Sequence, residues 1–210
     1  MCYHTTQKKS KKELAERFKV DINESLDISG ELFNGFTFPH TPVISSKNKN
    51  KMALFQWGLI PNWSKEKSIQ QYTLNAKIET LDEKPSFKNS IQQRCLIVAD
   101  GFMEWQWLDK KGKTKQQYHI TLPNQDAFAF AGIWSEWVNP STGEIINTYS
   151  MVTTEANPLM SEIHNTKKRM PVILTPQNEQ DWLNGKNYQD FAKCDLALNA
   201  VKVNEILTLF

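Results

Sequence analysis

The cysteine at position 2, directly after the initiator methionine, carries more chemistry than any other residue of this sequence. Methionine aminopeptidases remove Met1 when the second side chain is small, so we expect the mature chain to begin at Cys2. An amino-terminal cysteine holds an amine and a thiol side by side, with ordinary pKa values of roughly 7.7–8.0 and about 8.5. An aldehyde would condense with the amine to an imine, and the thiolate would then close a thiazolidine ring at high effective molarity. The alternative is a chance cysteine that lies frayed in solvent. The reactive interpretation therefore depends on residues elsewhere in the sequence that could assist Cys2.

Polar residues stand among aromatic or apolar ones in four further segments. They are residues 57–63 (WGLIPNW), 74–80 (LNAKIET), 99–105 (ADGFMEW) and 163–172 (IHNTKKRMPV). Together with Met1-Cys2 these segments resemble, in the expected order, the SRAP family of SOS-response-associated peptidases or abasic-site processing proteins. The resemblance runs to about residue 174, and five ordered motifs are a far more specific signal than any one of them.

The resemblance implies a function that fits the chemistry of Cys2. Proteins of this family cross-link themselves to abasic sites in single-stranded DNA. Their amino-terminal cysteine traps the ring-opened sugar aldehyde as a thiazolidine, which shields the lesion from strand cleavage. We therefore expect a DNA repair protein whose partner is single-stranded DNA with abasic sites, with no cofactor and no metal. Weak lyase activity through the imine and self-removal of Met1 are further expectations, whereas general peptidase activity is not.

Three residues of these motifs are candidates for assisting Cys2. Glu104 has aromatic or apolar neighbours, so burial would raise its pKa and suit it to proton transfer, unless its strand parity turns it to solvent. Asn75 can donate and accept at once, which suits holding the sugar or the cysteine backbone, although an asparagine here could also cap a helix. His164 could share proton transfer with Glu104 or donate to the sugar oxygen that leaves the anomeric carbon. Its alternative role is to complement the dipole at a helix carboxyl end.

Four other residues are candidates for contacts with DNA. Arg169 and Lys77 could bind phosphates, which position a strand without reading its sequence. Trp57 and Trp63 could offer flat faces to the bases next to the lesion. We place the remaining conspicuous tryptophans in the core, namely Trp105, Trp134 and Trp182, and we interpret the lysines of residues 110–115 as a solvated hairpin tip.

The sequence departs from the family pattern at several of these positions. His4 stands where the family commonly has arginine, and Lys77 replaces the arginine of Asn-Ala-Arg, which keeps the charge but loses the bidentate fork. His164 and Arg169 lie five residues apart instead of two, which weakens the assignment of the histidine. Residues 36–39 (FTFP) replace the usual Asn-x-Ala-Pro. These departures affect the grip on DNA more than the chemistry of the cysteine.

Other classes of function remain open from the sequence. An amino-terminal-nucleophile thiol hydrolase or peptidase would also use Cys2 with a nearby base, but we find no glycine-rich oxyanion loop near the motifs. A non-covalent single-stranded DNA-binding module would leave the cysteine incidental, and mutating Cys2 would separate it from a trapping protein. A metal enzyme has little support, because the histidines at 4, 40, 119 and 164 show no ligand spacing.

The elements that must position these residues follow from periodicity and turn signals. Apolar runs and alternation predict strands at residues 52–59, 94–99, 102–108, 117–122, 127–137, 145–154, 171–174 and 196–203, with a turn at 45–51. Capping residues predict helices at 11–18, 158–163 and from Thr175-Pro176 to Trp182. The pattern predicts an α+β fold: an antiparallel sheet curled towards a barrel, with short peripheral helices.

Composition sets the outer limits of the interpretation. A chain of 210 residues fits one domain, 1–210, and no stretch approaches the roughly 20 apolar residues of a membrane span. Because no apolar signal region follows the amino-terminal residues, we expect the protein to be cytoplasmic. We also expect a monomer. The net charge of +2 is too small to identify a nucleic-acid binder, and only three of the 25 basic residues are arginines. Contacts with a polyanion must therefore depend mainly on lysines.

Overall fold

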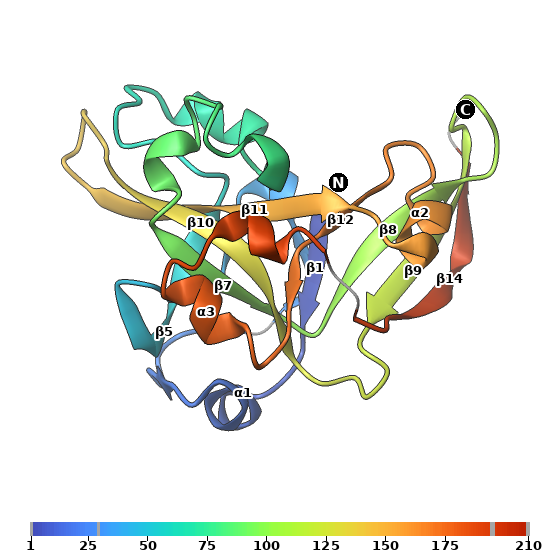
Figure 1. Ribbon diagram of the computed structural model, residues 1–210, viewed down its shortest axis with the longest axis horizontal. Helices are drawn as coiled ribbons and strands as arrows, with labels where there is room; N and C mark the ends of the chain where they lie inside the picture. Colours follow the sequence, from blue (N-terminus) through green and yellow to red (C-terminus); the bar gives the residue numbers. More distant parts are fainter. Residues whose placement is uncertain (1, 29, 194–195, 209–210) are drawn as a thin grey trace.

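A closed five-stranded barrel forms the centre of the computed structural model, which describes residues 2–28, 30–193 and 196–208 (Figure 1). Its strands follow the order β11, β10, β7, β4, β5, and a second pairing of β5 with β11 closes the ring. The other neighbours are antiparallel, and only the closing pair is parallel. The barrel strands are β4 (His40–Ser45), β5 (Asn48–Trp57), β7 (Arg94–Ala99), β10 (Phe128–Val138) and β11 (Ile145–Glu155). Shorter strands extend it: β2 (Asp21–Ile22), β6 (Asn75–Lys77), β12 (Arg169–Pro171) and β13 (Ile173–Leu174).

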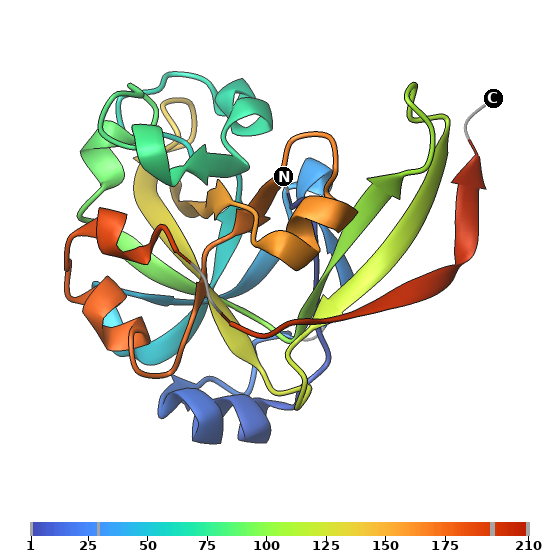
Figure 2. The same cartoon turned by 45° about the vertical axis from the view of Figure 1, so that its right-hand side comes forward.

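A second sheet extends away from the barrel and contains β1, which follows Cys2 (Figures 1 and 2). Its order is β14, β9, β8, β1, β3, with the bounds Asn199–Thr208, Thr114–Thr121, Gly101–Trp107, His4–Gln7 and Gly30–Asn34. The chain crosses from β7 to β8 at Asp100, whose carboxylate accepts hydrogen bonds from the Thr6 hydroxyl and the Lys8 backbone, both at 2.6 Å. The next residue is glycine, and a Cβ there would lie 2.3 Å from Nε2 of His119 and 3.1 Å from the Ile120 carbonyl oxygen, so a larger residue would require the His119 ring to move. This crossover holds β1 and β8 side by side.

Short helices cover the ends and edges of the sheets. Helix α1 (Lys11–Phe18) begins at a capping box between Ser10 and Glu13, and α2 (Pro158–Ile163) begins at Asn157, whose side chain accepts from the backbone N–H of Met160. Helix α3 spans Glu179–Leu183. Short 3₁₀ helices are η1 (Gly35–Thr37), η2 (Lys67–Tyr72), η3 (Ile78–Thr80), η4 (Lys88–Ser90) and η5 (Tyr188–Phe191). In the described part of the chain no helix is long and apolar enough to cross a membrane.

The predicted fold class is confirmed, with differences at the ends of elements. The turn predicted at 45–51 is confined to the link between Ser45 and Asn48, because β5 begins four residues earlier than expected. Helix α3 starts after Asn178 rather than at Thr175, because the Asn178 side chain instead accepts from the Thr175 backbone and holds a turn there. Strand β14 begins at Asn199 and runs beyond the predicted end.

Candidate active site around Cys2

The Cys2 side chain is fully buried at the start of β1, with 0 % of its surface exposed. It belongs to an apolar cluster that also contains Trp57, Leu74 and Met151. Its thiol donates a long hydrogen bond of 3.5 Å to the carbonyl oxygen of His4. Burial, together with the nearby charge of Glu104, raises the pKa of the Cys2 thiol far above its ordinary value. The residue is therefore not frayed in solvent, and its thiol stays protonated near pH 7, whereas the sequence suggested the ordinary pKa of a free cysteine.

Asn75 holds the backbone of Cys2. Strand β6 runs parallel to β11 with Asn75 opposite Met151, and the Asn75 Nδ2 group donates to the Cys2 carbonyl oxygen at 2.9 Å. Its other side-chain atom, Oδ1, is buried and has no hydrogen-bond partner among the described residues. A buried acceptor without a partner costs free energy until a donor arrives, so this oxygen is suited to receive a hydroxyl or amine. Asn75 lies in a strand, so its alternative role as a helix cap is wrong.

Glu104 lies on β8 with only 3 % of its surface exposed. Phe102 and Glu104 are buried on one face of the strand, whereas Met103 and Trp105 on the other face are half-buried. Glu104 does have the opposite parity to Trp105, but the face it occupies is the inner one. Burial raises the pKa of the Glu104 carboxyl from 4.5 to about 7, opposed by a hydrogen bond from the Trp105 backbone. The predicted rise in the pKa of this carboxyl is confirmed, and the expectation that Trp105 is a core residue is wrong.

His164 caps the carboxyl end of α2 and is buried. Its Nδ1 atom lies 2.9 Å from the carbonyl oxygen and 3.1 Å from the backbone nitrogen of Arg169. The loop is longer than in the family pattern, yet the His164 ring still contacts Arg169, the arginine that the family places two residues after the histidine. Burial lowers the pKa of His164 to about 4, so the ring is neutral near pH 7 and does not serve as a cation at the helix end. Helix α2 is joined to the active-site strand by a hydrogen bond from Gln106 to the Glu162 carbonyl, 3.0 Å long.

The guanidinium of Arg169 is already occupied. Its Nη1 and Nη2 atoms donate to the two carboxylate oxygens of Glu79 at 2.8 and 2.9 Å, and Nη2 also donates to the Thr153 carbonyl at 2.7 Å. This fork joins the 74–80 motif to the 163–172 motif. The ion pair positions the loop that carries His164, and a buried guanidinium paired in this way with Glu79 does not favour the phosphate contact predicted for Arg169.

The other predicted DNA contacts separate into a core residue and surface residues. Trp57 is 0 % exposed, donates from Nε1 to the Leu74 carbonyl at 2.9 Å and stacks on Tyr149, so neither ring face is open to a base. The prediction of base stacking by Trp57 is therefore incompatible with its position. Trp63 is 51 % exposed, and Lys77 is exposed at the end of β6, two residues from Asn75. The predicted core positions of Trp134 and Trp182 are confirmed.

His4 belongs to the site, although no role was predicted for it from the sequence. It lies on β1 opposite Met103, and its ring meets the ring of Trp105 edge-on at a centroid distance of 4.8 Å. Its Nδ1 atom is buried without a hydrogen-bond partner among the described residues, and burial lowers the pKa of the ring. The signal that could have found it is its place two residues after the cysteine, where the family commonly has arginine.

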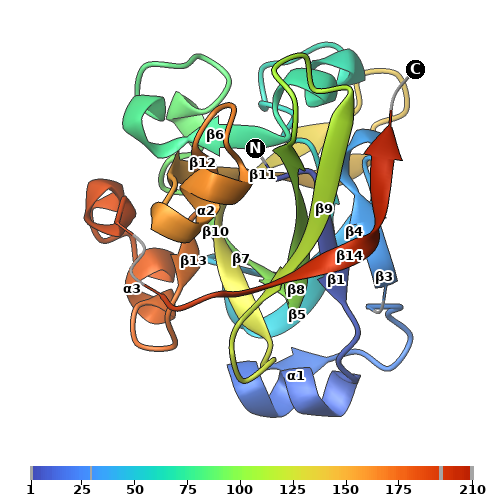
Figure 3. The ribbon, with the colours of Figure 1, turned by 90° about the vertical axis from the view of Figure 1, so that its right-hand side faces the viewer.

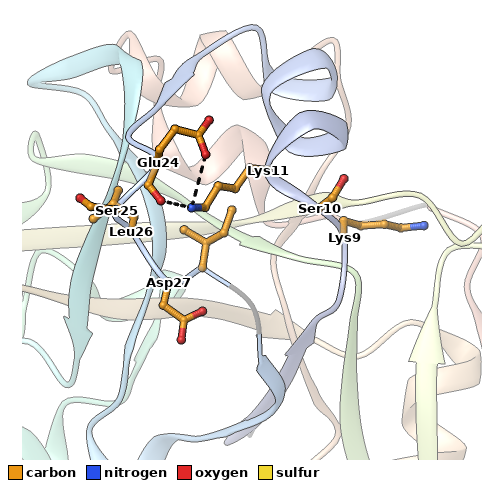
Figure 4. A pocket seen from close by; sticks show the side chains of 8 residues that line it. Lys9, Ser10, Lys11, Glu24, Ser25, Leu26 and Asp27 are labelled. Atoms are coloured by element: carbon orange, nitrogen blue, oxygen red, sulfur yellow. Dashed lines mark hydrogen bonds and ion pairs between the residues drawn. The ribbon is translucent and has the colours of Figure 1, made fainter.

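The elements that carry these residues meet at one end of the molecule. Figure 3 shows β6, β12 and α2 beside the amino-terminal end of the chain, with the β8–β9 hairpin rising next to them. A hollow of roughly 420 Å³ near α1 lies elsewhere: most of its lining residues are charged or polar, and Lys11 binds both the carbonyl and the carboxylate of Glu24 (Figure 4). It contains none of the predicted site residues. No group of three or more His, Cys, Asp or Glu side chains within the described ranges could hold a metal ion.

Comparison with known proteins agrees with the motifs. The sequence model of the family "SOS response associated peptidase (SRAP)" matches residues 1–207. The chain is 42 % identical to the abasic site processing protein YoqW of Bacillus subtilis over 177 residues, 80 % of this chain and 76 % of the relative. It is 31 % identical to the abasic site processing protein HMCES of Xenopus tropicalis, over 76 % of this chain and 52 % of that protein. A crystal structure of a Bacteroides thetaiotaomicron protein, 32 % identical, superposes with a TM-score of 0.88 over 97 % of this chain and 92 % of the other.

Proposed function

The chain belongs to the SOS response associated peptidase (SRAP) family, and from this premise we propose that it processes abasic sites in single-stranded DNA through a covalent bond to Cys2. The observation that carries the proposal is the junction of three groups at one point. The Cys2 backbone is held by Asn75, and the Cys2 thiol is close enough to the buried Glu104 for the carboxylate charge to raise the pKa of the thiol. An aldehyde that reaches this point meets an amine, a thiol and a proton donor together.

The proposed reaction begins once removal of Met1 turns the Cys2 amide nitrogen into an amine. The amine adds to the aldehyde carbon of the ring-opened sugar and forms a carbinolamine. Glu104 in its protonated form donates a proton to the leaving hydroxyl, so water departs and a protonated imine remains beside the carboxylate. The thiol sulfur then bonds to the imine carbon, its proton passes to the Glu104 carboxylate, and a neutral thiazolidine results. One water is released and Glu104 returns to its starting state.

The other polar groups of the site have roles that follow from their protonation. His164 is neutral near pH 7, so it can take up or relay a proton during ring opening but cannot supply a fixed positive charge. Asn75 orients Cys2 and has an open acceptor at Oδ1 for the sugar hydroxyl or the new amine. Lys77 and Trp63, both exposed, are the proposed contacts for phosphate and base.

The raised pKa of the thiol argues against the hydrolase alternative. Cysteine nucleophiles of acyl transfer depend on a thiolate, which is favoured where positive charge lowers the pKa. Here burial and a carboxylate act in the opposite direction. Addition of a thiol to a protonated imine needs no preformed thiolate, because Glu104 can accept the proton as the bond forms.

The test mixes the purified protein with an oligonucleotide that contains one abasic site, followed by a denaturing gel and intact mass. The wild type should give a covalent band whose mass lacks Met1 and one water, and Cys2→Ala should give none. Cys95→Ala is the matched control, because Cys95 is an equally buried thiol on barrel strand β7. A stable adduct with Cys2→Ala, or none with the wild type when its amino-terminal cysteine is free, would overturn the proposal. In the second case, retained DNA affinity would identify a non-covalent binding module.

Cys2→Ser separates the two chemical steps. The serine amine can still form the imine, which borohydride would trap, but the thiazolidine cannot close. Because a β-elimination at the lesion also proceeds through the imine, this variant should show more strand cleavage than the wild type. Retention of Met1 in a Glu104→Gln preparation made in the same host would indicate that the site also removes its own methionine. We further propose that residues 1–210 act as one domain, as a cytoplasmic monomer.

A further inference from the structure

The loop between His164 and Arg169 is longer than the family spacing, and its four residues are exposed. Four residues, 165–168, separate the two, where the family pattern has one. The Lys168 backbone N–H donates to the His164 carbonyl at 2.9 Å, and Lys168 takes a left-handed conformation with φ of 47°. The ends of the loop thus stay together while Lys167 and Lys168 are exposed.

Asn165, the first residue of this loop, fastens it to the tip region of the β8–β9 hairpin. Its Oδ1 atom accepts from the Trp107 backbone N–H at 3.1 Å, and its Nδ2 group donates to the Trp107 carbonyl at 2.8 Å. The side chain thereby imitates one more backbone pairing at the edge of β8. Between loop and hairpin lies a hollow of roughly 550 Å³, lined by Trp107, Leu108, Asp109, Lys110, Asn165 and Thr166.

The two segments together are strongly basic, although the whole chain is nearly neutral. Residues 107–115 and 164–168 contain six lysines and a single carboxylate, that of Asp109. This carboxylate is occupied by the hairpin itself, because it accepts from the backbone N–H groups of Lys111 and Thr114 at 2.8 and 2.5 Å. Five of the lysines are exposed, and Lys115 lies over the Trp107 ring at 5.4 Å. The charge complement of such a surface is a polyanion.

The surface stands at the end of the molecule that carries Cys2. Figures 2 and 3 show the hairpin tip and the α2–β12 loop on the same side as the amino terminus, with α1 at the opposite end. We propose that the β8–β9 hairpin and the 165–168 loop form a second nucleic-acid subsite, which binds the phosphates of the single strand beyond the lesion. The place of this subsite relative to the lesion rests on the proposed function. The proposal goes beyond the interpretation of these lysines as a solvated hairpin tip, with which their exposure is also compatible.

The first test measures the salt dependence of binding to an unmodified single strand of about 20 nucleotides, long enough to span more than one subsite. The hairpin variant carries Lys110→Gln, Lys111→Gln and Lys113→Gln. The matched control carries Lys8→Gln, Lys12→Gln and Lys51→Gln, three exposed lysines that lie on or beside α1 and β2. Removing one lysine–phosphate ion pair should reduce the slope of log K against log salt by about 0.7, so the slope should fall by roughly 2 in the hairpin variant and stay unchanged in the control.

A second variant guards against a folding defect in the hairpin. Lys167→Gln with Lys168→Gln changes the other wall of the subsite and should reduce the slope by about 1.4, while thermal unfolding reports whether each variant is folded. Slopes equal to the control in both folded variants would overturn the proposal. These measurements use no lesion, so they remain decisive if the wild type fails to form an adduct. If it does form one, the hairpin variant should slow cross-linking of a long strand more than that of a five-nucleotide strand centred on the lesion.

Discussion

Replacing Glu104 by glutamine removes a buried acid whose ionisation the fold disfavours, so the substitution should change how stability depends on pH. The pKa of the carboxyl rises from 4.5 to about 7 in the folded protein, where the side chain is 3 % exposed. Between these values the folded state holds more protons than the unfolded state, so the free energy of unfolding falls as pH rises through this window. At about 1.4 kcal/mol per pKa unit the wild type should lose roughly 3 kcal/mol by pH 8.

The assay is urea unfolding of wild type and Glu104→Gln at intervals from pH 4.5 to 8.5, followed by tryptophan fluorescence. The variant should gain stability relative to the wild type as pH rises, with most of the change between pH 5 and 7 and a plateau above. Groups common to both proteins, His164 included, cancel in the difference. Glu16→Gln, the same change on the exposed face of α1, sets the background. A difference between the two proteins that stays constant across this range would refute the reasoning, whatever its size at one pH.

Three further changes test the geometry of the site. Asn75→Ala removes the 2.9 Å hydrogen bond to the Cys2 carbonyl, and at about 1 kcal/mol this should slow cross-linking roughly fivefold in single-turnover gels. The pKa of His164 is lowered from 6.5 to about 4, so the NMR shifts of its ring should be those of neutral imidazole down to about pH 5. The contribution of His164 to the free energy of unfolding should be complete above pH 6.5 and should be lost as pH falls towards 4. Arg169→Lys removes the bidentate ion pair with Glu79 and should lower the free energy of unfolding by about 1–3 kcal/mol in denaturant titrations, with Glu79→Gln giving a non-additive double variant.

Part of the site could be predicted from residues that are close together in sequence. Of the apolar residues around Glu104, Phe102 shares its buried face of β8, whereas Met103 and Trp105 lie on the other face, because successive side chains of a strand alternate. The prediction of a desolvated carboxyl is therefore supported by Phe102, two residues away, rather than by the immediate neighbours. The capping residues Ser10 and Asn157 placed two helices at their observed starts, since caps act within one turn. Cys2, Asn75 and Glu104 could be grouped only through the family pattern, because they come from three segments distant in sequence.

Contacts made by distant parts of the chain account for what could not be predicted. Trp57 is buried because β5 closes the barrel against β11, which places Trp57 opposite Tyr149, and nothing near residue 57 encodes that pairing. Arg169 resembled a phosphate ligand for a similar reason, since its partner Glu79 lies 90 residues earlier in the chain. The sequence motifs did contain both residues of this ion pair, but periodicity alone does not pair them.

The burial of the Cys2 thiol, at first sight a handicap for a nucleophile, fits a reaction in which the amine acts first. A carboxylate and a thiolate side by side in a low-dielectric site repel one another, so ionisation of both is strongly disfavoured. Near pH 7 the Cys2 thiol is therefore protonated, and the Glu104 carboxyl, whose pKa is about 7, is present in both its protonated and its ionised form. In the proposed reaction such a pair would react slowly with general electrophiles and would become reactive once an imine places positive charge beside it. The positive charge of the protonated imine would offset the cost of removing the proton from the Cys2 thiol. The site would therefore close a thiazolidine only on an aldehyde that the Cys2 amine has already captured.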